Sequence, residues 1–402
     1  MNDSGITSVS QYKSRGEYPR VANKLTWESI NAFPIKRADM TEAEMRKLVV
    51  DFYIFSKSFV WVADDDYTYQ LAKGYDPITL KKGGVYAGFP YISLGSNNVY
   101  RFMDYMDPET GVIDIKAAGA NPRIFGNQCS MTCNWAWARI INSAKCCWTE
   151  DMVKKNGIVP VGPYTYAEDL EELTKEYGTK QIVQENGLDI MSQSYAQLKP
   201  ADGLVKTGHV ILCTELPHVE YTPDGAIDPE RSYILISDQT RATGWKPYSN
   251  NSGDNYEMCG NINRQRTFQY LFEKGYIPFT FKEYSGDAPI EETVVSFSHT
   301  GETITKEQLF TSKITTNFSL LDIYAMIFDS EGNEVYRLAV RARQACVEEL
   351  QFSENAIIKG VNMASVWGSL NDLSAEKDYT VQIVAQLGTG ERPTLWEGKL
   401  ER

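Results

Sequence analysis

Histidines, long apolar runs and clusters of basic residues are scarce or absent in this sequence. Its 402 residues include 3 histidines, which leaves few candidates for a catalytic imidazole. No apolar stretch reaches the roughly 18 residues that a membrane-spanning helix needs. Lys and Arg number 40 against 53 Asp and Glu, a formal net charge of -13, and they form no basic run. The sequence therefore predicts a protein without a transmembrane segment and without nucleic acid as a partner.

Cysteines are few, odd in number and irregularly spaced. This pattern argues against a complete disulfide framework, so at least one thiol is expected to be free. The spacings also lack the paired C-x-x-C pattern of structural zinc, and we predict no metal site. The seven positions are Cys129, Cys133, Cys146, Cys147, Cys213, Cys259 and Cys346.

The chain is long enough for two or three domains, and 42% of it is hydrophobic, which is typical of a globular protein. The turn-rich stretch S-G-D-A-P at 285–289 predicts a boundary, with domains at 1–287 and 288–402. The second domain has short strand-like runs and a turn signal at 329–333, which predicts a small antiparallel β-sandwich of the Ig-like kind. Apart from His299 it carries no suggestive arrangement of catalytic residue types, so we expect a binding or spacer module.

Helix signals are clearest in two capping boxes of the first domain. Thr41 and Glu44 form one such box, and the apolar pattern after it predicts a helix that continues to about Val62. A second box at Thr165 predicts another helix, which Gly178 would close as a left-handed cap. A third helix is expected between them, over the stretch that holds the first two cysteines.

That stretch, G-N-Q-C-S-M-T-C at 126–133, makes Cys129 the candidate nucleophile. Asn127 is a good N-cap, which would place Cys129 in the first helical turn, where the helix dipole favours a thiolate. The dipole contributes about 0.3 to 1 kcal/mol, which is less than one pKa unit and cannot ionise a thiol by itself at neutral pH. A histidine partner is therefore required.

Among the histidines, His209 is the favoured partner. It precedes the apolar run 210–213, which predicts a strand, and Gly208 lets a substrate or another backbone approach closely. His218 follows a proline at the far end of that strand, and His299 lies beyond the domain boundary.

A third residue would orient the imidazole. The run 233–236 predicts a second strand, joined to the first by a long loop. If the two strands pair antiparallel, His209 and Asp238 become neighbours, so Asp238 or Gln239 can accept a ring N–H. Strand parity alone leaves the choice between these two open.

A structural interpretation of the cysteines stands beside the catalytic one. A free cysteine near a helix start is more often buried packing than a nucleophile. Cys133 lies one turn beyond Cys129 on the same face, and we interpret it as part of the core.

Several short segments resemble the NlpC-type cell-wall cysteine peptidases. Cys129-Ser130 matches the start of that family's nucleophile helix, and the Trp-Ala-Trp step at 135–137 falls at the right distance. Gln128 and Met131 stand where the family has Asp and Gly.

Three further segments extend the resemblance. Gly-Phe-Pro-Tyr at 88–91 looks like a family segment whose tyrosine lines the site, which makes Tyr91 a candidate and Tyr86 its substitute. The stretch 198–213 is similar to the family's strand leading to Gly-His-Val and supports His209. Ser-Asp-Gln-Thr at 237–240 looks like the Ser-Glu-Gln-Asn of the related CHAP amidases, with Asp238 in the carboxylate position.

The resemblance implies an α+β, papain-like fold in which a cysteine-bearing helix packs against an antiparallel sheet bearing the histidine. It implies hydrolysis of amide bonds in the peptide stems of peptidoglycan, through a thioester and without a metal or organic cofactor. Ser130 and Gln239 would lie at the site, and the amide of Cys129, with Tyr91, would stabilise the oxyanion. A bacterial cell-envelope location follows, although the N-terminus lacks a secretory signal pattern and a cytosolic location stays open.

Two alternatives belong to other functional classes. The chain would be a non-catalytic cell-wall-binding protein if the scaffold has lost its activity. It would be another acyl-transfer enzyme, transglutaminase-like or a lipid amidase, if the same residues act on a different amide.

Overall fold

The computed structural model describes residues 24–36, 38–120, 125–142, 148–240, 245–249, 255–285, 292–343, 347–353, 362–374 and 377–401. These residues divide into two compact units, one on each side of residue 290. The boundary expected between residues 287 and 288 lies outside the described residues.

The N-terminal unit contains two large sheets and a separate hairpin, β2 (Tyr67–Gln70) with β3 (Pro77–Leu80). The first sheet has the order β10–β11–β4–β1–β5, formed by β10 (Trp245–Ser249), β11 (Asn255–Cys259), β4 (Val85–Ala87), β1 (Val60–Ala63) and β5 (Val112–Ile113). The second has the order β12–β9–β8–β7–β13–β6, formed by β12 (Asn261–Thr267), β9 (Tyr233–Asp238), β8 (His209–Cys213), β7 (Gly203–Lys206), β13 (Ile277–Phe281) and β6 (Ile158–Pro160). All strand pairs of this second sheet are antiparallel.

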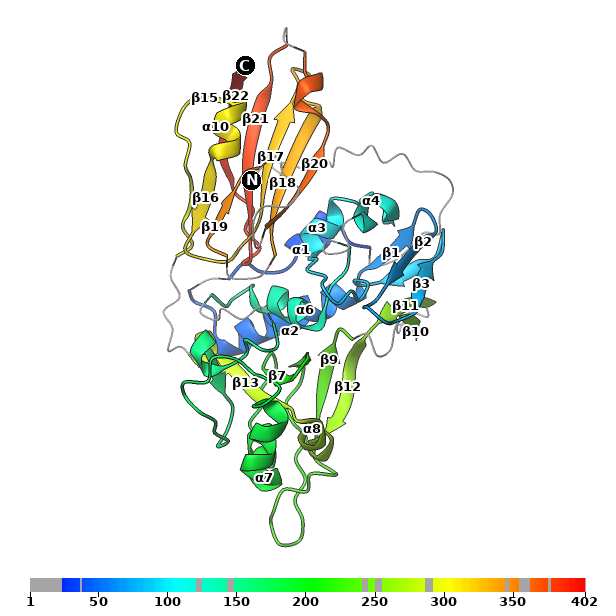
Figure 1. Cartoon of the computed structure of the whole chain (residues 1–402), viewed down its shortest axis with the longest axis vertical. Coiled ribbons are helices and arrows are strands. Elements are labelled where there is room, and N and C mark those ends of the chain that lie inside the picture. Colours follow the sequence, from blue (N-terminus) through cyan, green and yellow to red (C-terminus); the bar gives the residue numbers. More distant parts are fainter. Residues whose placement is uncertain are drawn as a thin grey trace. The chain divides into compact units, whose positions relative to one another are not determined.

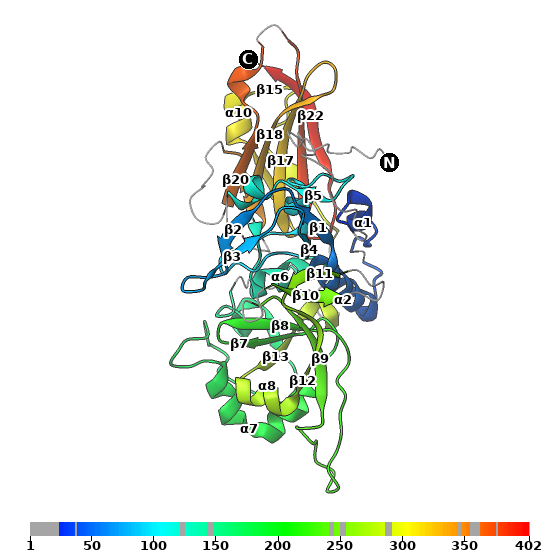
Figure 2. The same ribbon diagram turned by 90° about the vertical axis from the view of Figure 1, so that its right-hand side faces the viewer.

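Helices pack around the six-stranded sheet. In both views α2 and α6 lie above β7, β9 and β13, whereas α7 and α8 lie below them (Figures 1 and 2). Helix α6 packs along β8 and against α2, and α7 packs along β13. The helices of this unit are α1 (Trp27–Asn31), α2 (Glu42–Ser58), α3 (Val99–Met103), α4 (Ile115–Gly119), α6 (Cys129–Trp137), α7 (Thr179–Tyr195), α8 (Phe268–Lys274) and α9 (Lys282–Ser285).

Helix α2 begins as its capping box predicts, with Thr41 as N-cap and Glu44 bonding back to the Thr41 amide. It ends at Ser58, four residues before the predicted end at Val62. The last predicted turn forms β1 instead, because Val60 and Val62 are β-branched and pair in register with β4 and β5.

The helix predicted after Thr165 is absent, and residues 165–177 form turns and bends. Tyr166 and Leu173 are buried in this irregular conformation. The Tyr166 hydroxyl accepts the Lys154 amide and the Leu173 amide donates to the Glu150 carbonyl, so tertiary contacts override the local helix signal. The Thr165 amide binds Oδ1 of Asn186 rather than capping a helix. Gly178 is not a C-cap but the N-cap of α7.

The pairing of the two strands around the long loop is confirmed. Strands β8 and β9 pair antiparallel, with Leu212 opposite Ser237 and Cys213 opposite Ile236. Strand β12 pairs on the other side of β9, with Asn261 directly opposite Asp238. The first residue of β8 and the last residue of β9 therefore meet at one end of the sheet.

The C-terminal unit contains two sheets that share one apolar core. Ile314 and Leu350 of the small sheet and Ile323 and Val381 of the large sheet belong to this core, and all four are buried. The small sheet is β14 (Val295–Phe297), β16 (Lys313–Thr316) and β19 (Glu349–Gln351). The large sheet has the order β15 (Thr303–Thr305), β22 (Thr394–Glu401), β21 (Thr380–Leu387), β17 (Leu320–Phe328), β18 (Glu334–Ala342) and β20 (Asn362–Trp367), and helix α10 spans Lys306–Thr311.

One glycine fixes the junction between α2 and the first sheet. Gly88 has φ +64°, and a Cβ atom there would lie 2.6 Å from the carbonyl oxygen of Lys57. Its amide donates to the Phe59 carbonyl and its carbonyl accepts from the Trp61 indole, both at 2.8 Å. A side chain at this position would push the end of α2 away from the strand.

We predict that Gly88→Ala lowers the free energy of unfolding by about 2 to 4 kcal/mol, because the left-handed conformation costs about 1 to 2 kcal/mol and the clash adds to it. Gly74→Ala is the matched control, since Gly74 has φ +87° but no atom within 4 Å of its Cβ position. Urea unfolding followed by tryptophan fluorescence measures both variants. Equal losses of stability would show that the contact with Lys57 does not matter.

Candidate active site

Helix α6 starts at Cys129, and its N-cap is Gln128 rather than the predicted Asn127. Asn127 is held one residue earlier, because its amide and carbonyl pair with Pro90 and Ile92, at 2.8 and 3.1 Å. Its side chain also donates to the Asn97 carbonyl at 2.8 Å. The thiol nevertheless lies where expected, in the first turn of a helix.

The His209 ring and the backbone amides of Val210 and Ser130 act on the Cys129 thiol and favour its charged form. Burial raises the pKa of this thiol, since Cys129 is 5% exposed. The hydrogen bond from His209, the charge of the imidazolium and the two amides together outweigh burial and lower the pKa below the ordinary value of 9.0. The site therefore favours a thiolate.

The imidazole of His209 is held between this thiol and Asp238. Its Nε2 lies 3.2 Å from Oδ2 of Asp238, which accepts the ring N–H. Burial lowers the pKa of His209, but the hydrogen bonds and charges of Asp238 and Cys129 raise it to about 9. Because Nε2 is occupied, Nδ1 is the nitrogen that can exchange a proton with the thiol.

Strand register explains why the carboxylate, and not the neighbouring amide, reaches the imidazole. The pairing of Leu212 with Ser237 places Asp238 opposite Ile211, which has the same parity as His209. Asp238 and His209 are thus diagonal neighbours on one face of the sheet. Gln239 has the opposite parity.

Asp238 has further partners that keep it charged. Nδ2 of Asn261, directly across the strand pair, donates to Oδ1 at 2.6 Å. Burial raises the pKa of Asp238, whereas the His209 and Asn261 hydrogen bonds and the Lys57 charge lower it, and the net shift is downward. The sequence offered no signal for Asn261, whose role depends on the register of β12.

A buried lysine, Lys57, lies behind the carboxylate. It is 1% exposed, and its ammonium donates to Oε1 of Gln239 and to the Cys259 carbonyl. Burial lowers its pKa to about 8. Gly260, with φ +86°, leaves room for this contact, because a Cβ there would lie 2.6 Å from the Lys57 nitrogen. Gln239 also donates to the Phe89 carbonyl at 2.9 Å, so it ties the lysine to the first sheet.

Of the other residues that the sequence predicted, Ser130 and Tyr91 lie near the nucleophile and Tyr86 does not. Ser130 is buried and contributes its amide to the thiol. The backbone of Tyr91 lies beside Asn127, two residues before the nucleophile. The hydroxyl of Tyr86 instead accepts the Lys81 amide at 2.8 Å, and its ring packs on Trp61, so Tyr86 belongs to the first sheet.

The other two histidines lie elsewhere. Nε2 of His218 lies 3.2 Å from Oε1 of Glu220 and its ring stacks on Tyr233. Nε2 of His299 donates to the Thr303 carbonyl at 2.7 Å in the C-terminal unit. Neither contact involves a thiol.

The other thiols that the structure describes have pKa values shifted the opposite way. Burial raises the pKa of Cys133 well above its ordinary value, raises that of Cys213 strongly and raises that of Cys259 to about 12. All four described cysteines are free and buried. Cys146, Cys147 and Cys346 lie outside the described residues. Cys129 alone, within the described part of the chain, combines a free thiol with a lowered pKa.

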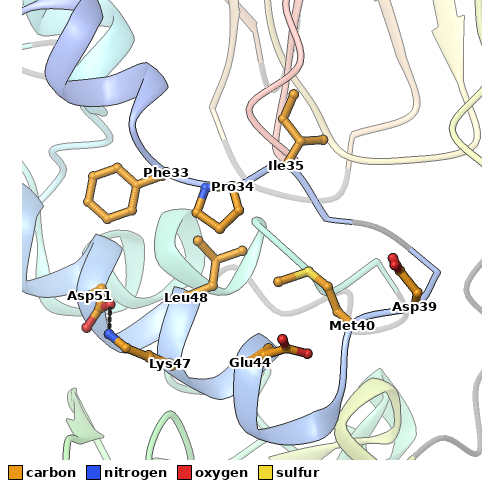
Figure 3. Close-up of a pocket in the computed structure, with 9 residues that line it drawn as sticks. All are labelled: Phe33, Pro34, Ile35, Asp39, Met40, Glu44, Lys47, Leu48 and Asp51. Atoms are coloured by element: carbon orange, nitrogen blue, oxygen red, sulfur yellow. Dashed lines mark hydrogen bonds and ion pairs between the residues drawn. The ribbon is translucent and has the colours of Figure 1, made fainter.

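Two of the pockets in the described part of the chain flank helix α2, and neither is lined by Cys129, His209 or Asp238. One, of 470 Å³, is lined by Phe33, Pro34, Ile35, Asp39, Met40, Glu44, Lys47, Leu48 and Asp51 (Figure 3). There Lys47 is paired with Asp51 on the same helix. The other, of 620 Å³, lies between α2 and the segment that holds Lys199 and Pro200. Both belong to the surface of α2 and not to the candidate active site.

Comparison with known proteins gives no identification, because no protein-family model matches the chain and no curated protein matches it. Within the described residues no group of three or more His, Cys, Asp or Glu is placed to hold a metal ion. No described helix has the length and apolar character needed to cross a membrane.

We predict that iodoacetamide at neutral pH labels Cys129 faster than any other cysteine, because its pKa is lowered whereas those of Cys133, Cys213 and Cys259 are raised. In His209→Ala the labelling of Cys129 should slow by about tenfold for each unit by which the thiol pKa rises. Mass spectrometry of tryptic peptides over time measures each site separately.

The pH dependence of the labelling rate is a second test of the interaction between Cys129 and His209. In the wild type, the rate of Cys129 alkylation should stay high as the pH falls below 9. In His209→Ala, that rate should decline over the pH range in which an ordinary thiol becomes protonated. Equal labelling of all exposed thiols, or a His209→Ala rate equal to wild type, would contradict the pairing.

Proposed function

We propose that this protein is a cysteine peptidase or amidase that hydrolyses amide bonds, and that its substrates are the peptide stems of peptidoglycan. The observation that carries the proposal is the arrangement of Cys129, His209 and Asp238, a thiol with a lowered pKa beside an oriented imidazole. The substrate class rests on the resemblance of the short motifs around these residues to the NlpC-type and CHAP enzymes. The papain-like fold and the cell-envelope location are part of the same proposal.

In the first step the thiolate of Cys129 attacks the carbonyl carbon of the scissile amide. The imidazolium of His209 then gives its proton to the leaving amine, which departs and leaves a thioester on the sulfur. Asp238 holds the ring with Nε2 toward itself and stabilises the imidazolium.

The developing oxyanion needs hydrogen-bond donors beside the sulfur. The backbone amide of Cys129 has no intrahelical acceptor, because Cys129 is the first residue of α6. The side-chain nitrogen of Gln128 is buried and has no hydrogen-bond partner within the described residues. These two groups are the donors that we assign to the oxyanion, with Tyr91 next to them in the chain segment that pairs with Asn127.

In the second step His209, now neutral, takes a proton from a water molecule, and the resulting hydroxide attacks the thioester. The acid product leaves, and the thiolate and imidazolium form again. No step of this sequence requires an electron acceptor or a metal.

We predict that Cys129→Ala abolishes the release of soluble peptides from purified peptidoglycan, because the thioester cannot form, while the far-ultraviolet circular dichroism stays unchanged. Cys133→Ala is the matched control, since Cys133 lies on the same helix but its raised pKa keeps it a neutral thiol. Chromatography of new amino groups and peptides measures release. Binding of peptidoglycan without turnover by the wild type would instead support a binding protein.

A further inference from the structure

A lysine and a tyrosine, Lys206 and Tyr276, lie at the end of the sheet that holds His209. Lys206 is the last residue of β7 and pairs directly opposite His209 across the hairpin. Opposed residues of an antiparallel pair point to the same face, so the side chains of Lys206 and His209 leave the sheet on the same face.

Two tyrosines lie close to cationic side chains. The ammonium of Lys206 lies 5.5 Å from the ring centroid of Tyr276, which precedes β13 on the next strand along. The guanidinium of Arg266 lies 4.6 Å, and the ammonium of Lys274 5.8 Å, from the ring of Tyr270 on α8. Strand register pairs Arg266 with Ile234, toward the end of β9 away from Asp238, so Lys206 and Tyr276, and not Arg266, lie at the His209 end of the sheet.

Lys206 lies near one charge of the same sign and one of the opposite sign. The charges that act on it are those of Lys274, which repels it, and of the Cys129 thiolate. No carboxylate of the described residues is among them. Burial and the Lys274 charge lower the pKa of Lys206. An anion placed between the two lysines would relieve this repulsion, in a chain whose formal net charge is -13.

The turn between β7 and β8 is exposed at this end of the sheet. Gly208, in the turn between β7 and β8, is exposed and has no atom within 4 Å of its Cβ position. The His209 side chain is 16% exposed. The turn that joins Lys206 to His209 therefore lies at the protein surface.

We propose that Lys206 and Lys274, with Tyr276, form a subsite for a carboxylate of the substrate, adjacent to the amide bond that Cys129 attacks. The proposal rests on the proposed function and narrows its substrate class to peptides with a free carboxylate near the scissile bond. The ammonium groups would hold the carboxylate by charge, and the Tyr276 ring would fix the Lys206 stem.

Two alkylating reagents that differ in charge provide the test. Iodoacetate carries a carboxylate and iodoacetamide is neutral, and both alkylate the same sulfur. We expect the ratio of their rate constants at Cys129 to fall by about two- to fivefold in Lys206→Gln and in Lys274→Gln, as the loss of one nearby charge implies. The neutral reagent corrects for any change in thiolate content.

Matched variants control for structure. Lys206→Arg keeps the charge and should keep the ratio, and Lys73→Gln removes an exposed lysine of the β2–β3 connection and should leave it unchanged. Lys274 is exposed, so its variant keeps the test valid if Lys206→Gln does not fold. An unchanged ratio in both glutamine variants, with fast iodoacetamide labelling, overturns the subsite but not the enzyme. Slow labelling of wild-type Cys129 by both reagents overturns the proposed function as well.

A comparison of two forms of the substrate provides a second test of the carboxylate subsite. Stem peptides with free carboxylates are compared with the same peptides as carboxamides, and kcat/KM is measured. Wild-type enzyme should prefer the carboxylate form, and Lys206→Gln should lose that preference. An equal preference in both proteins would contradict the subsite.

Discussion

The contact between the Cys129 thiol and the His209 imidazole is the interaction on which the candidate site depends. It joins the first residue of a helix to the first residue of a strand, 80 positions apart in the chain. Neither group would reach its useful charge state alone, because burial disfavours both the thiolate and the imidazolium. The charge of each group offsets the cost of burying the other. The candidate site therefore requires that helix α6 and strand β8 stay in contact.

Three further residues stabilise the Cys129–His209 pair. Asp238 orients the imidazole, Asn261 orients Asp238, and the charge of Lys57 helps to keep the carboxylate ionised. A fully buried lysine is costly unless it is well bound, and this one is held by an amide oxygen and a backbone carbonyl. The buried charges thus alternate from thiolate to imidazolium to carboxylate to ammonium, and loss of any one would leave a neighbour uncompensated.

The sequence predicted the short-range features of this site better than the features that depend on long-range contacts. The capping box of α2 and the antiparallel β8–β9 pair follow from patterns a few residues long, and the structure has both. The helix predicted from the Thr165 box is absent, because tertiary contacts bury Tyr166 and Leu173 in an irregular conformation instead. The choice of N-cap also differed, since the long-range pairing of Asn127 overrides its capping preference.

The residues that the sequence did not predict reach the site through contacts between segments that lie far apart in the chain. Asn261 reaches Asp238 because β12 pairs with β9, and Lys57 reaches Gln239 because the end of α2 meets the joint between β11 and β12. Neither contact leaves a signal within a short window of sequence. The choice between Asp238 and Gln239 was open for the same reason, and the pairing of Leu212 with Ser237 decides it.

The most direct measurement of the central claim is the titration of the Cys129 thiolate by its ultraviolet absorbance, taken as the difference between wild type and Cys129→Ser. The account predicts a difference spectrum that disappears, as the pH is lowered, with a midpoint below the ordinary thiol value of 9.0. A thiolate that forms only at or above that value would contradict it.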